Sequence, residues 1–227
     1  MFGALDLAVK EMKKINCQNC IVVGVDNLNP NANHKMTSIG LNMGCVFLQK
    51  RHASKRIYSR IMDSKLHWGR THNSQLTDHQ PESLEEVYHD WNVDPSNVTY
   101  VENCGRNINN QQNMRALNQT LVKSNRNSPL IISSDESSIG PMSGMTAIMK
   151  VIISIHRGSV PAISKQRLSV ILNGHETKCS ASRELSDGLI AMNAQCDGDS
   201  AHVLLQPNSL NDQKRLGTKI LINFGKL

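Results

Sequence analysis

The sequence predicts an α/β protein in which helices cover layered sheets. Short apolar runs rich in β-branched residues alternate with segments whose apolar residues recur at helical spacing, along most of the 227 residues. This alternation is typical of α/β folds. No internal repeat and no low-complexity linker divides the chain, so the elements are expected to follow one another without a break.

The first expected elements are a helix and a strand. Helical spacing of apolar residues predicts an amphipathic helix over residues 3–15, with Asp6 outside its apolar stripe. The stripe consists of Leu5, Ala8, Val9 and Met12. The run Ile-Val-Val-Gly-Val at 21–25 then predicts a strand buried on both faces, because it is apolar without interruption.

Strands and helices are expected to alternate along the rest of the chain, with a polar loop over residues 64–81. The expected helices cover residues 82–91, residues 111–123 and a segment that ends at Ile155. The expected strands cover residues 44–49, 56–63, 98–102, a run from Leu130, and residues 168–172, 188–191 and 202–205.

Composition and charge restrict the class of protein. The chain is 39% hydrophobic and 19% charged, which is ordinary globular composition, and no apolar run is long enough to cross a bilayer. We therefore expect a cytoplasmic protein without a membrane partner. The net charge is +6, but only 4% of residues are aromatic, so we expect a solvated basic face and no nucleic-acid partner. The densest basic group is Lys50, Arg51, Lys55 and Arg56.

Two groups of residues raise the question of metal binding. Six cysteines at irregular spacing do not form a disulfide framework, but Cys17 and Cys20 make a Cys-x-x-Cys pair that either consists of free thiols or needs two more ligands to hold zinc. The other group is acidic, and a solvated loop is the favoured interpretation; it consists of Glu184, Asp187, Asp197 and Asp199. We expect no bound metal and no cofactor.

Three segments carry motifs in a recognisable order. Val-Asp-Pro at 93–95 precedes Tyr-Val-Glu-Asn-Cys-Gly at 100–105, an apolar run and a Ser-Gly-initiated helix lie within 130–161, and Ser-Ala-His-Val-Leu-Leu-Gln-Pro ends at Pro207. The order resembles the β-ketoacyl synthase, or condensing, domain of animal- and insect-type fatty acid synthases and related polyketide synthases. The resemblance implies a thiolase-like fold with α-β-α-β-α layers, here incomplete because the N-terminal part is missing.

The resemblance also implies a reaction that this chain is not expected to perform. The family condenses acyl and malonyl thioesters on acyl carrier protein, using a cysteine nucleophile and two histidines. Met1 falls near the nucleophile's position, and Cys104 stands where the first histidine is expected. Glu136 replaces the family lysine, and Pro141 follows Gly140 where the second histidine is absent. We therefore expect no intact catalytic residue and no activity.

Local alternatives concern three of the remaining residues. Cys104 could be a redirected nucleophile, but a partly buried thiol in a decayed pocket is the favoured interpretation because no histidine lies within motif distance. His156 and His202 stand beside apolar residues and are interpreted as core or edge histidines.

The expected organisation follows from the resemblance. Residues 1–50 would be a remnant of the N-terminal half, residues 51–207 a ketoacyl-synthase-like half, and residues 208–227 a tail or linker. The expected function is that of a truncated, degenerate condensing domain, with an acyl-binding or carrier-binding scaffold as the alternative and a thiol or zinc protein as the third. Expected partners are acyl carrier protein, the rest of a multidomain synthase, or a second copy in a homodimer.

Overall fold

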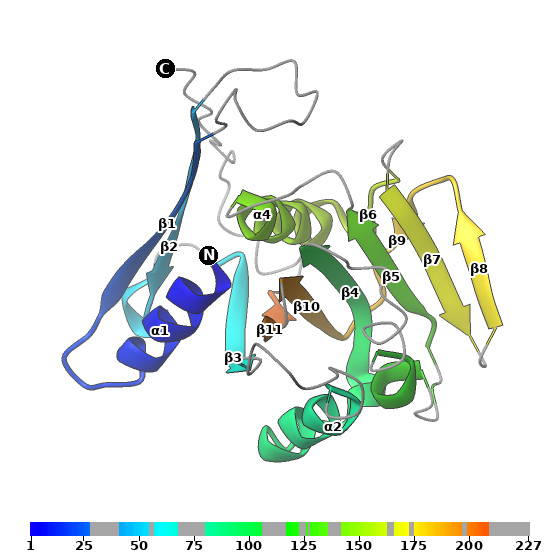
Figure 1. The fold of residues 1–227 in the computed structure, drawn as a ribbon, viewed down its shortest axis with the longest axis horizontal. Helices are drawn as coiled ribbons and strands as arrows, with labels where there is room; N and C mark the ends of the chain where they lie inside the picture. The colour runs from blue at the N-terminus through cyan, green and yellow to red at the C-terminus, as the bar shows by residue number, and fades with distance from the viewer. Residues whose placement is uncertain are drawn as a thin grey trace, which may run out of the picture.

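In a computed structural model, the chain forms a seven-stranded mixed sheet and a separate two-stranded ribbon, with helices packed between and outside them (Figure 1). The structure describes residues 1–27, 41–54, 57–67, 80–105, 117–122, 126, 128–135, 142–162, 166–172, 175–196 and 199–208.

The elements alternate as the sequence predicts. The helices are α1 (Phe2–Met12), α2 (Gln80–Asp90) and α4 (Met142–Arg157), with single turns η1 (Arg51–Ala53), η2 (Pro95–Asn97) and η3 (Asn118–Val122). The first six strands are β1 (Asn19–Asn27), β2 (Leu41–Gln49), β3 (Ser59–His67), β4 (Val98–Gly105), β5 (Leu130–Asp135) and β6 (Ser159–Val160). The other five are β7 (Gln166–Leu172), β8 (His175–Cys179), β9 (Arg183–Glu184), β10 (Leu189–Cys196) and β11 (Asp199–Pro207).

The large sheet has the strand order β3-β11-β10-β4-β5-β7-β8. Its centre is parallel, because β4 runs parallel to both β10 and β5. The strands on either side, β11 and β7, run antiparallel to their central neighbours. The carboxyl ends of β10, β4 and β5 therefore lie at one edge of the sheet, where ligand sites of α/β folds form.

The helices lie in two layers, one on each face of this sheet. On one face, α4 contacts β4 and β10 and on its other side contacts β1 and β2, while α1 lies between β3 and β1. On the opposite face, α2 and η3 bury Leu84, Tyr88 and Leu121 against β4 and β5. The described part of the chain thus shows four of the five predicted layers: helix, sheet, helix and ribbon.

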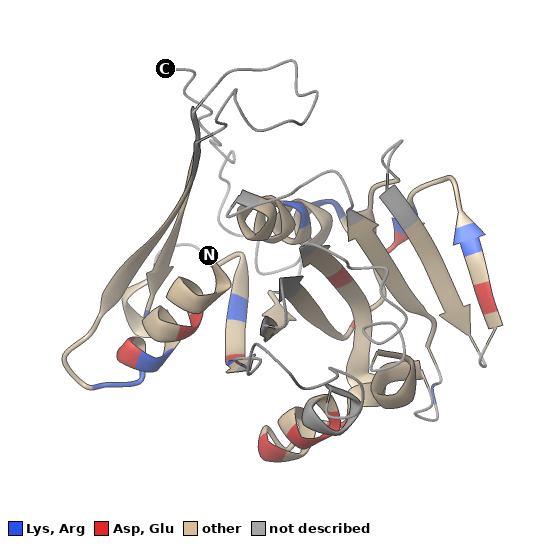
Figure 2. Ribbon diagram, viewed as in Figure 1, with Lys and Arg blue, Asp and Glu red and all other residues tan. Residues whose placement is uncertain are grey.

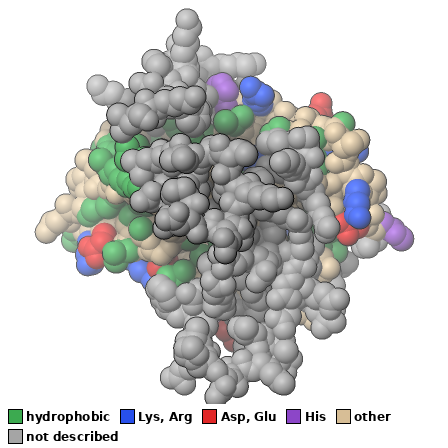
Figure 3. Space-filling model, turned by 45° about the horizontal axis from the view of Figure 1, so that its top comes forward, with side chains coloured by type: hydrophobic (Ala, Val, Ile, Leu, Met, Phe, Trp, Pro, Cys, Tyr) green, Lys and Arg blue, Asp and Glu red, His purple; other side chains and the backbone are tan. Residues whose placement is uncertain are grey.

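The ribbon corrects the prediction that residues 21–25 are buried on both faces. Val22 is 3% exposed and packs into the core with Val46 and Leu48, whereas Ile21 is 66% exposed. Three cross-strand pairs share that outer face: Ile21 with Phe47, Val23 with Cys45, and Val25 with Met43. Figure 3 shows hydrophobic side chains gathered on the same side of the molecule as the ribbon. No described element covers them, so an apolar run alone did not determine burial.

Helix α1 corrects a second prediction, because Asp6 is buried rather than solvent-facing. Its carboxylate accepts a hydrogen bond from Ser64 Oγ at 2.9 Å and forms an ion pair with Lys10 Nζ at 2.7 Å. The partner Ser64 comes from β3, against which α1 packs. Burial of the charge is possible because both interactions compensate for lost hydration.

Other differences lie at element boundaries and edges. Strand β3 continues to His67, so residues 64–67 are not part of a loop. Strands β8 and β9 were not expected, since β8 is a polar edge strand with four of its five residues exposed. Of the helix expected over residues 111–123, the described part contains Leu117 and the π-helical turn η3; the rest lies outside the described residues, as does most of the tail from residue 209.

Candidate functional site

The parallel centre of the sheet places the carboxyl ends of β4, β5 and β10 at one edge. Cys104 lies near the carboxyl end of β4, in register with Asp135 of β5 and with Ala194 of β10. The segment with Glu136 and Pro141 follows β5 directly, and residues 197–198 follow β10. Glu136 and Pro141 themselves lie outside the described residues. The strands that contain or directly precede these positions are therefore neighbours in the sheet, although they lie far apart in the sequence.

The starts of α1 and α4 also meet. A side chain at Gly144 would bring a Cβ within 2.7 Å of the Phe2 ring and 3.3 Å of Met1 Sδ, so the glycine permits this close approach. Phe2 and Met1 belong to the same apolar cluster as Cys104 and Ile148. Met1, the expected equivalent of the nucleophile, thus packs beside the first turn of α4.

Cys104 is fully buried, whereas the sequence predicts a partly buried thiol in a decayed pocket. It is 1% exposed and lies in the apolar cluster that also contains Tyr100, Ile131 and Met192. A thiol is a weak hydrogen-bond donor and has no cationic form, so it cannot do what an imidazole does at neutral pH.

His202 cannot pair with Cys104, because the two side chains lie on opposite faces of the sheet. His202 is held by Tyr88, whose hydroxyl lies 3.0 Å from Nε2, and its Nδ1 lies 3.5 Å from Asn193 Oδ1. Asn193 Nδ2 in turn donates to Asn103 Oδ1 at 3.1 Å. Asn103 and Cys104 are consecutive residues of β4, so their side chains point to opposite faces.

The two histidine predictions have different outcomes. His202 is 3% exposed and stacks on Trp91 with ring centroids 5.8 Å apart, which confirms it as a core histidine. His156 lies in the last turn of α4 and is exposed, so its assignment to the core or a sheet edge is wrong. The apolar residues Ile153 and Ile155 near His156 in the sequence do not bury it, because consecutive residues of a helix point in different directions.

A buried ion pair lies on the Cys104 face of β4 and was not predicted. Lys150 Nζ of α4 lies 2.9 Å from Glu102 Oε2 and 3.1 Å from Oε1. Tyr100 OH donates to the same carboxylate, and Lys150 also donates to Ser133 Oγ. Lys150 is 5% and Glu102 1% exposed. The indication available in the sequence was Lys150 itself, a lysine between the apolar residues Met149 and Val151 of α4.

The charges and hydrogen bonds of this cluster stabilise the packing of α4 on the sheet. Burial raises the pKa of the Glu102 carboxyl, while the Lys150 ammonium and hydrogen bonds from Tyr100, Lys150 and Ser133 oppose that shift. Burial also raises the pKa of the Tyr100 hydroxyl well above its usual value. The polar groups of Tyr100, Glu102, Ser133 and Lys150 interact with one another. The cluster therefore links α4 to β4 and β5.

The residues considered for metal binding are not gathered around an ion. Cys17 and Cys20 have their sulfur atoms 3.3 Å apart, but within the described ranges no three His, Cys, Asp or Glu side chains are grouped closely enough to hold a metal. Glu184 and Asp187 are exposed. The side chains of Asp197 and Asp199 lie outside the described residues.

The charges are dispersed among the described elements, as Figure 2 shows. Lys10 on α1 pairs with Asp6, and Lys13 and Lys14, which follow α1, pair with Asp63 and Glu11 respectively. Lys50 Nζ donates to the backbone oxygen of Lys14 at 2.9 Å, which places Lys50 and Arg51 near the end of α1. Lys55 and Arg56 lie outside the described residues. A search of the described helices identifies none that is both long and apolar enough to span a membrane.

Sequence comparison finds a family model that matches the middle of the chain. Residues 58–166 match the family model described as "Beta-ketoacyl synthase, C-terminal domain". Fatty acid synthase from the goose Anser anser anser is 25% identical over 186 residues, an alignment that covers 68% of this chain and 53% of the relative. The chain therefore spans about half the length of that curated relative.

Structural comparison identifies the fold. An oxazolomycin ketosynthase domain from Streptomyces albus has a TM-score of 0.68 at 18% identity, covering 91% of this chain and 62% of that chain. Ketosynthase twelve of the bacillaene polyketide synthase from Bacillus amyloliquefaciens has a TM-score of 0.70 at 16% identity, covering 92% of this chain and 45% of that chain. These similarities confirm the predicted layered, thiolase-like fold.

Proposed function

Because the chain carries a β-ketoacyl synthase C-terminal domain over residues 58–166 within a ketosynthase fold, we propose that it keeps the fold without the condensing reaction. The observation that carries this proposal is the burial of Cys104 at the end of β4, where the family resemblance places a histidine. Its relatives catalyse condensation with groups that must touch the thioester, and a 1% exposed thiol in an apolar cluster cannot.

The same proposal is supported by the charge of Glu136 and by the lack of hydrogen-bonding groups in the side chain of Pro141. Glu136 is an anion where the family has a lysine, and it would repel the carboxylate of a malonyl group. Pro141 has no donor or acceptor in its side chain. The loss of a single general acid or base lowers a rate by about 10²–10⁴-fold. The changes at Glu136 and Pro141, together with Cys104 in place of a histidine, therefore leave no efficient route to condensation.

A direct assay tests the proposal on the purified chain. We expect no β-ketoacyl product from acyl and malonyl thioesters of acyl carrier protein, measured by mass spectrometry, above the level given by the Cys104→Ala variant. Cys104→Ala is the matched control, because it removes the thiol with little change in side-chain volume. Product formed by the natural chain and lost in this variant would overturn the proposal and make Cys104 a nucleophile.

A second candidate function is a non-catalytic module that binds an acyl carrier protein, and the basic end of α1 favours it. Lys50 Nζ donates to the backbone oxygens of Lys14 and Ile15, so its ammonium lies just beyond the end of α1, and Arg51 follows it in the sequence. Opposite charge across an interface speeds and orients association. An acidic carrier would fit this surface, whether it comes as a separate protein or as part of a multidomain synthase.

Carrier binding can be measured by fluorescence anisotropy at increasing salt. We expect saturable binding that weakens with salt, and a loss of about fivefold in affinity for Arg51→Glu. Lys178→Glu is the control, since Lys178 is exposed on β8 at the other end of the large sheet. Equal effects of the two changes would show that only net charge matters and would contradict a defined docking surface.

The proposal also includes a homodimer and a division of the chain into residues 1–50, 51–207 and 208–227. The ribbon forms a sheet of its own, which supports a boundary near residue 50, although α1 packs on β3 of the following part. Limited proteolysis with mass spectrometry tests the boundary, and sedimentation velocity tests the dimer. Cleavage within residues 57–67 before any cleavage near residue 50 or after residue 207 would contradict the division.

A further inference from the structure

The turn between α1 and β1 holds two thiols in contact, apart from the edge of the sheet that carries the candidate site. Cys17 lies in the turn and Cys20 is the second residue of β1. Their sulfur atoms are 3.3 Å apart, whereas a disulfide bond needs about 2.05 Å. Closing the bond therefore needs a movement of little more than one ångström, in a turn with exposed neighbours.

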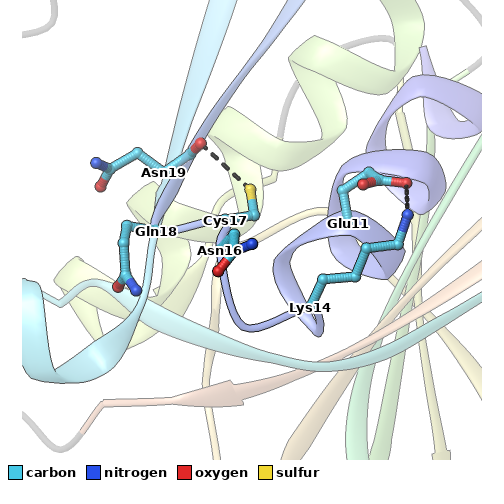
Figure 4. Close-up of a pocket in the computed structure, with 6 residues that line it drawn as sticks. All are labelled: Glu11, Lys14, Asn16, Cys17, Gln18 and Asn19. Atoms are coloured by element: carbon cyan, nitrogen blue, oxygen red, sulfur yellow. Dashed lines mark hydrogen bonds and ion pairs between the residues drawn. The ribbon is translucent and has the colours of Figure 1, made fainter.

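The surroundings leave the pair accessible to a small reagent. Cys17 lines a hollow of about 520 Å³ together with Glu11, Lys14, Asn16, Gln18 and Asn19. Figure 4 shows the Cys17 thiol beside the backbone oxygen of Asn19, to which it donates at 3.6 Å. Cys20 Sγ also lies 3.9 Å from the backbone oxygen of Ala8, and the side chain is partly buried against the core.

We propose that Cys17 and Cys20 are a reversible modification site at which the chain exchanges its dithiol for a disulfide with a small disulfide oxidant. This inference goes beyond the proposed function and does not depend on it. A structural zinc site needs four ligands, and among the described residues no group of three His, Cys, Asp or Glu side chains includes this pair.

The exchange runs in two balanced steps. The Cys17 thiolate attacks one sulfur of R–S–S–R, forms a Cys17–S–S–R bond and releases RS⁻. Cys20 then loses its proton, attacks Cys17 Sγ and releases the second RS⁻, so that the Cys17–Cys20 bond forms. The chain loses two protons and two electrons, and the oxidant is reduced to two thiols.

The local electrostatics determine which step is slow. The hydrogen bond with Cys17, followed by burial and by the Glu11 carboxylate, raises the pKa of the Cys20 thiol. The pair also follows the carboxyl end of α1, so the positive end of a helix dipole does not stabilise either thiolate. We expect the mixed disulfide on Cys17 to accumulate at neutral pH and to resolve faster as the pH rises.

The sequence permits a clean test on the full chain. Trypsin releases residues 15–35, which contain Cys17 and Cys20 and no other cysteine, and residues 36–50, which contain only Cys45. The chain is equilibrated in mixtures of oxidised and reduced glutathione, quenched with iodoacetamide and digested. We expect peptide 15–35 to lose two hydrogens and to resist alkylation at an oxidant ratio about tenfold lower than peptide 36–50 needs to gain glutathione.

Single variants separate the steps. Cys20→Ser should trap glutathione on Cys17, whereas Cys17→Ser should leave Cys20 largely unmodified, and Cys45→Ser should change nothing in peptide 15–35. The proposal is overturned if peptide 15–35 is alkylated twice at every ratio, or if its cysteines pair only between molecules. Stoichiometric zinc retained after dialysis and lost in both Cys17→Ser and Cys20→Ser would overturn it in favour of a metal site.

Discussion

The seven-stranded sheet and the β1–β2 ribbon are built from similarly apolar strands, yet they differ in what covers them. The central strands β4, β5 and β10 are buried between α4 on one face and α2 with η3 on the other. The ribbon buries one face on α1 and α4, and its outer face carries exposed Ile21, Phe47 and Met43. Strand formation therefore follows from the local sequence, whereas burial depends on the elements that pack there.

Within the large sheet, the residues that support packing can likewise be distinguished from those at the positions of the proposed chemistry. Tyr100 and Glu102 of β4 help to hold the layers together. Tyr100 OH donates to the Glu102 carboxylate, which pairs with Lys150 of α4. Only at its carboxyl end does β4 present Cys104 where the proposed reaction of the family would need a histidine. Packing and catalysis are thus supported by neighbouring residues of one strand and can be lost independently.

The largest expected effect tests the interior of the sheet. Lys150→Met removes the cation and leaves the Glu102 carboxyl buried without it, so we expect a loss of about 3–5 kcal/mol in the free energy of unfolding, measured with urea. The control Lys178→Met, at an exposed position of β8, should change the midpoint little. A loss for Lys150→Met no larger than for the control would show that the pair is not buried as described.

The same variant has a predicted pH dependence. Without the Lys150 ammonium to oppose it, burial raises the pKa of the Glu102 carboxyl in the folded state further above its unfolded value. A raised folded pKa gives stability that is present below the unfolded pKa and lost as the pH rises through the folded pKa. The destabilisation by Lys150→Met should therefore shrink on acidification from neutral pH, and an increase there would contradict the account.

The next effect compares the two faces of one strand. Val22→Ala should lower the free energy of unfolding by about 2 kcal/mol, because two buried methyl groups leave the core. Val23→Ala is the matched control, with the same chemistry and strand propensity but a 49% exposed side chain, and should stay within about 0.5 kcal/mol. Equal losses at the two positions would show that the outer face of the ribbon is covered in solution.

The smallest effect concerns the other face of the large sheet. Tyr88→Phe removes the hydroxyl that bonds His202 Nε2 and should lower the free energy of unfolding by about 1 kcal/mol. Because the ring remains, the packing against Trp91 should be retained. Unchanged stability together with unchanged NMR chemical shifts of the His202 ring would contradict the hydrogen bond.

Much of the fold could be predicted from periodicity, and the exceptions have physical reasons. The helix in residues 2–12 and the strands beginning at residues 19, 98 and 130 follow from regular apolar spacing. Asp6 was misplaced because its partner Ser64 lies 58 positions away in the sequence. Strand β8 was missed because an exposed edge strand carries no apolar alternation that a periodicity analysis could detect.

The candidate site could be predicted only as a set of positions. The motifs located Cys104, Glu136 and Pro141, but they did not show that β4, which contains Cys104, and β5, which Glu136 follows in the sequence, are parallel neighbours. The separation of Cys104 from His202 depends on strand register, which pairs Asn103 with Asn193 and Asn193 with His202. Long-range register of this kind cannot be deduced from local patterns.

The most direct test of the central claim is the release of radiolabelled carbon dioxide from malonyl-acyl carrier protein, since decarboxylation needs fewer catalytic groups than the full condensation. The account predicts release by the purified chain at the rate of the Cys104→Ala variant and of buffer alone. Faster release that depends on Cys104 would contradict it and would show that the chemistry, as well as the fold, has been kept.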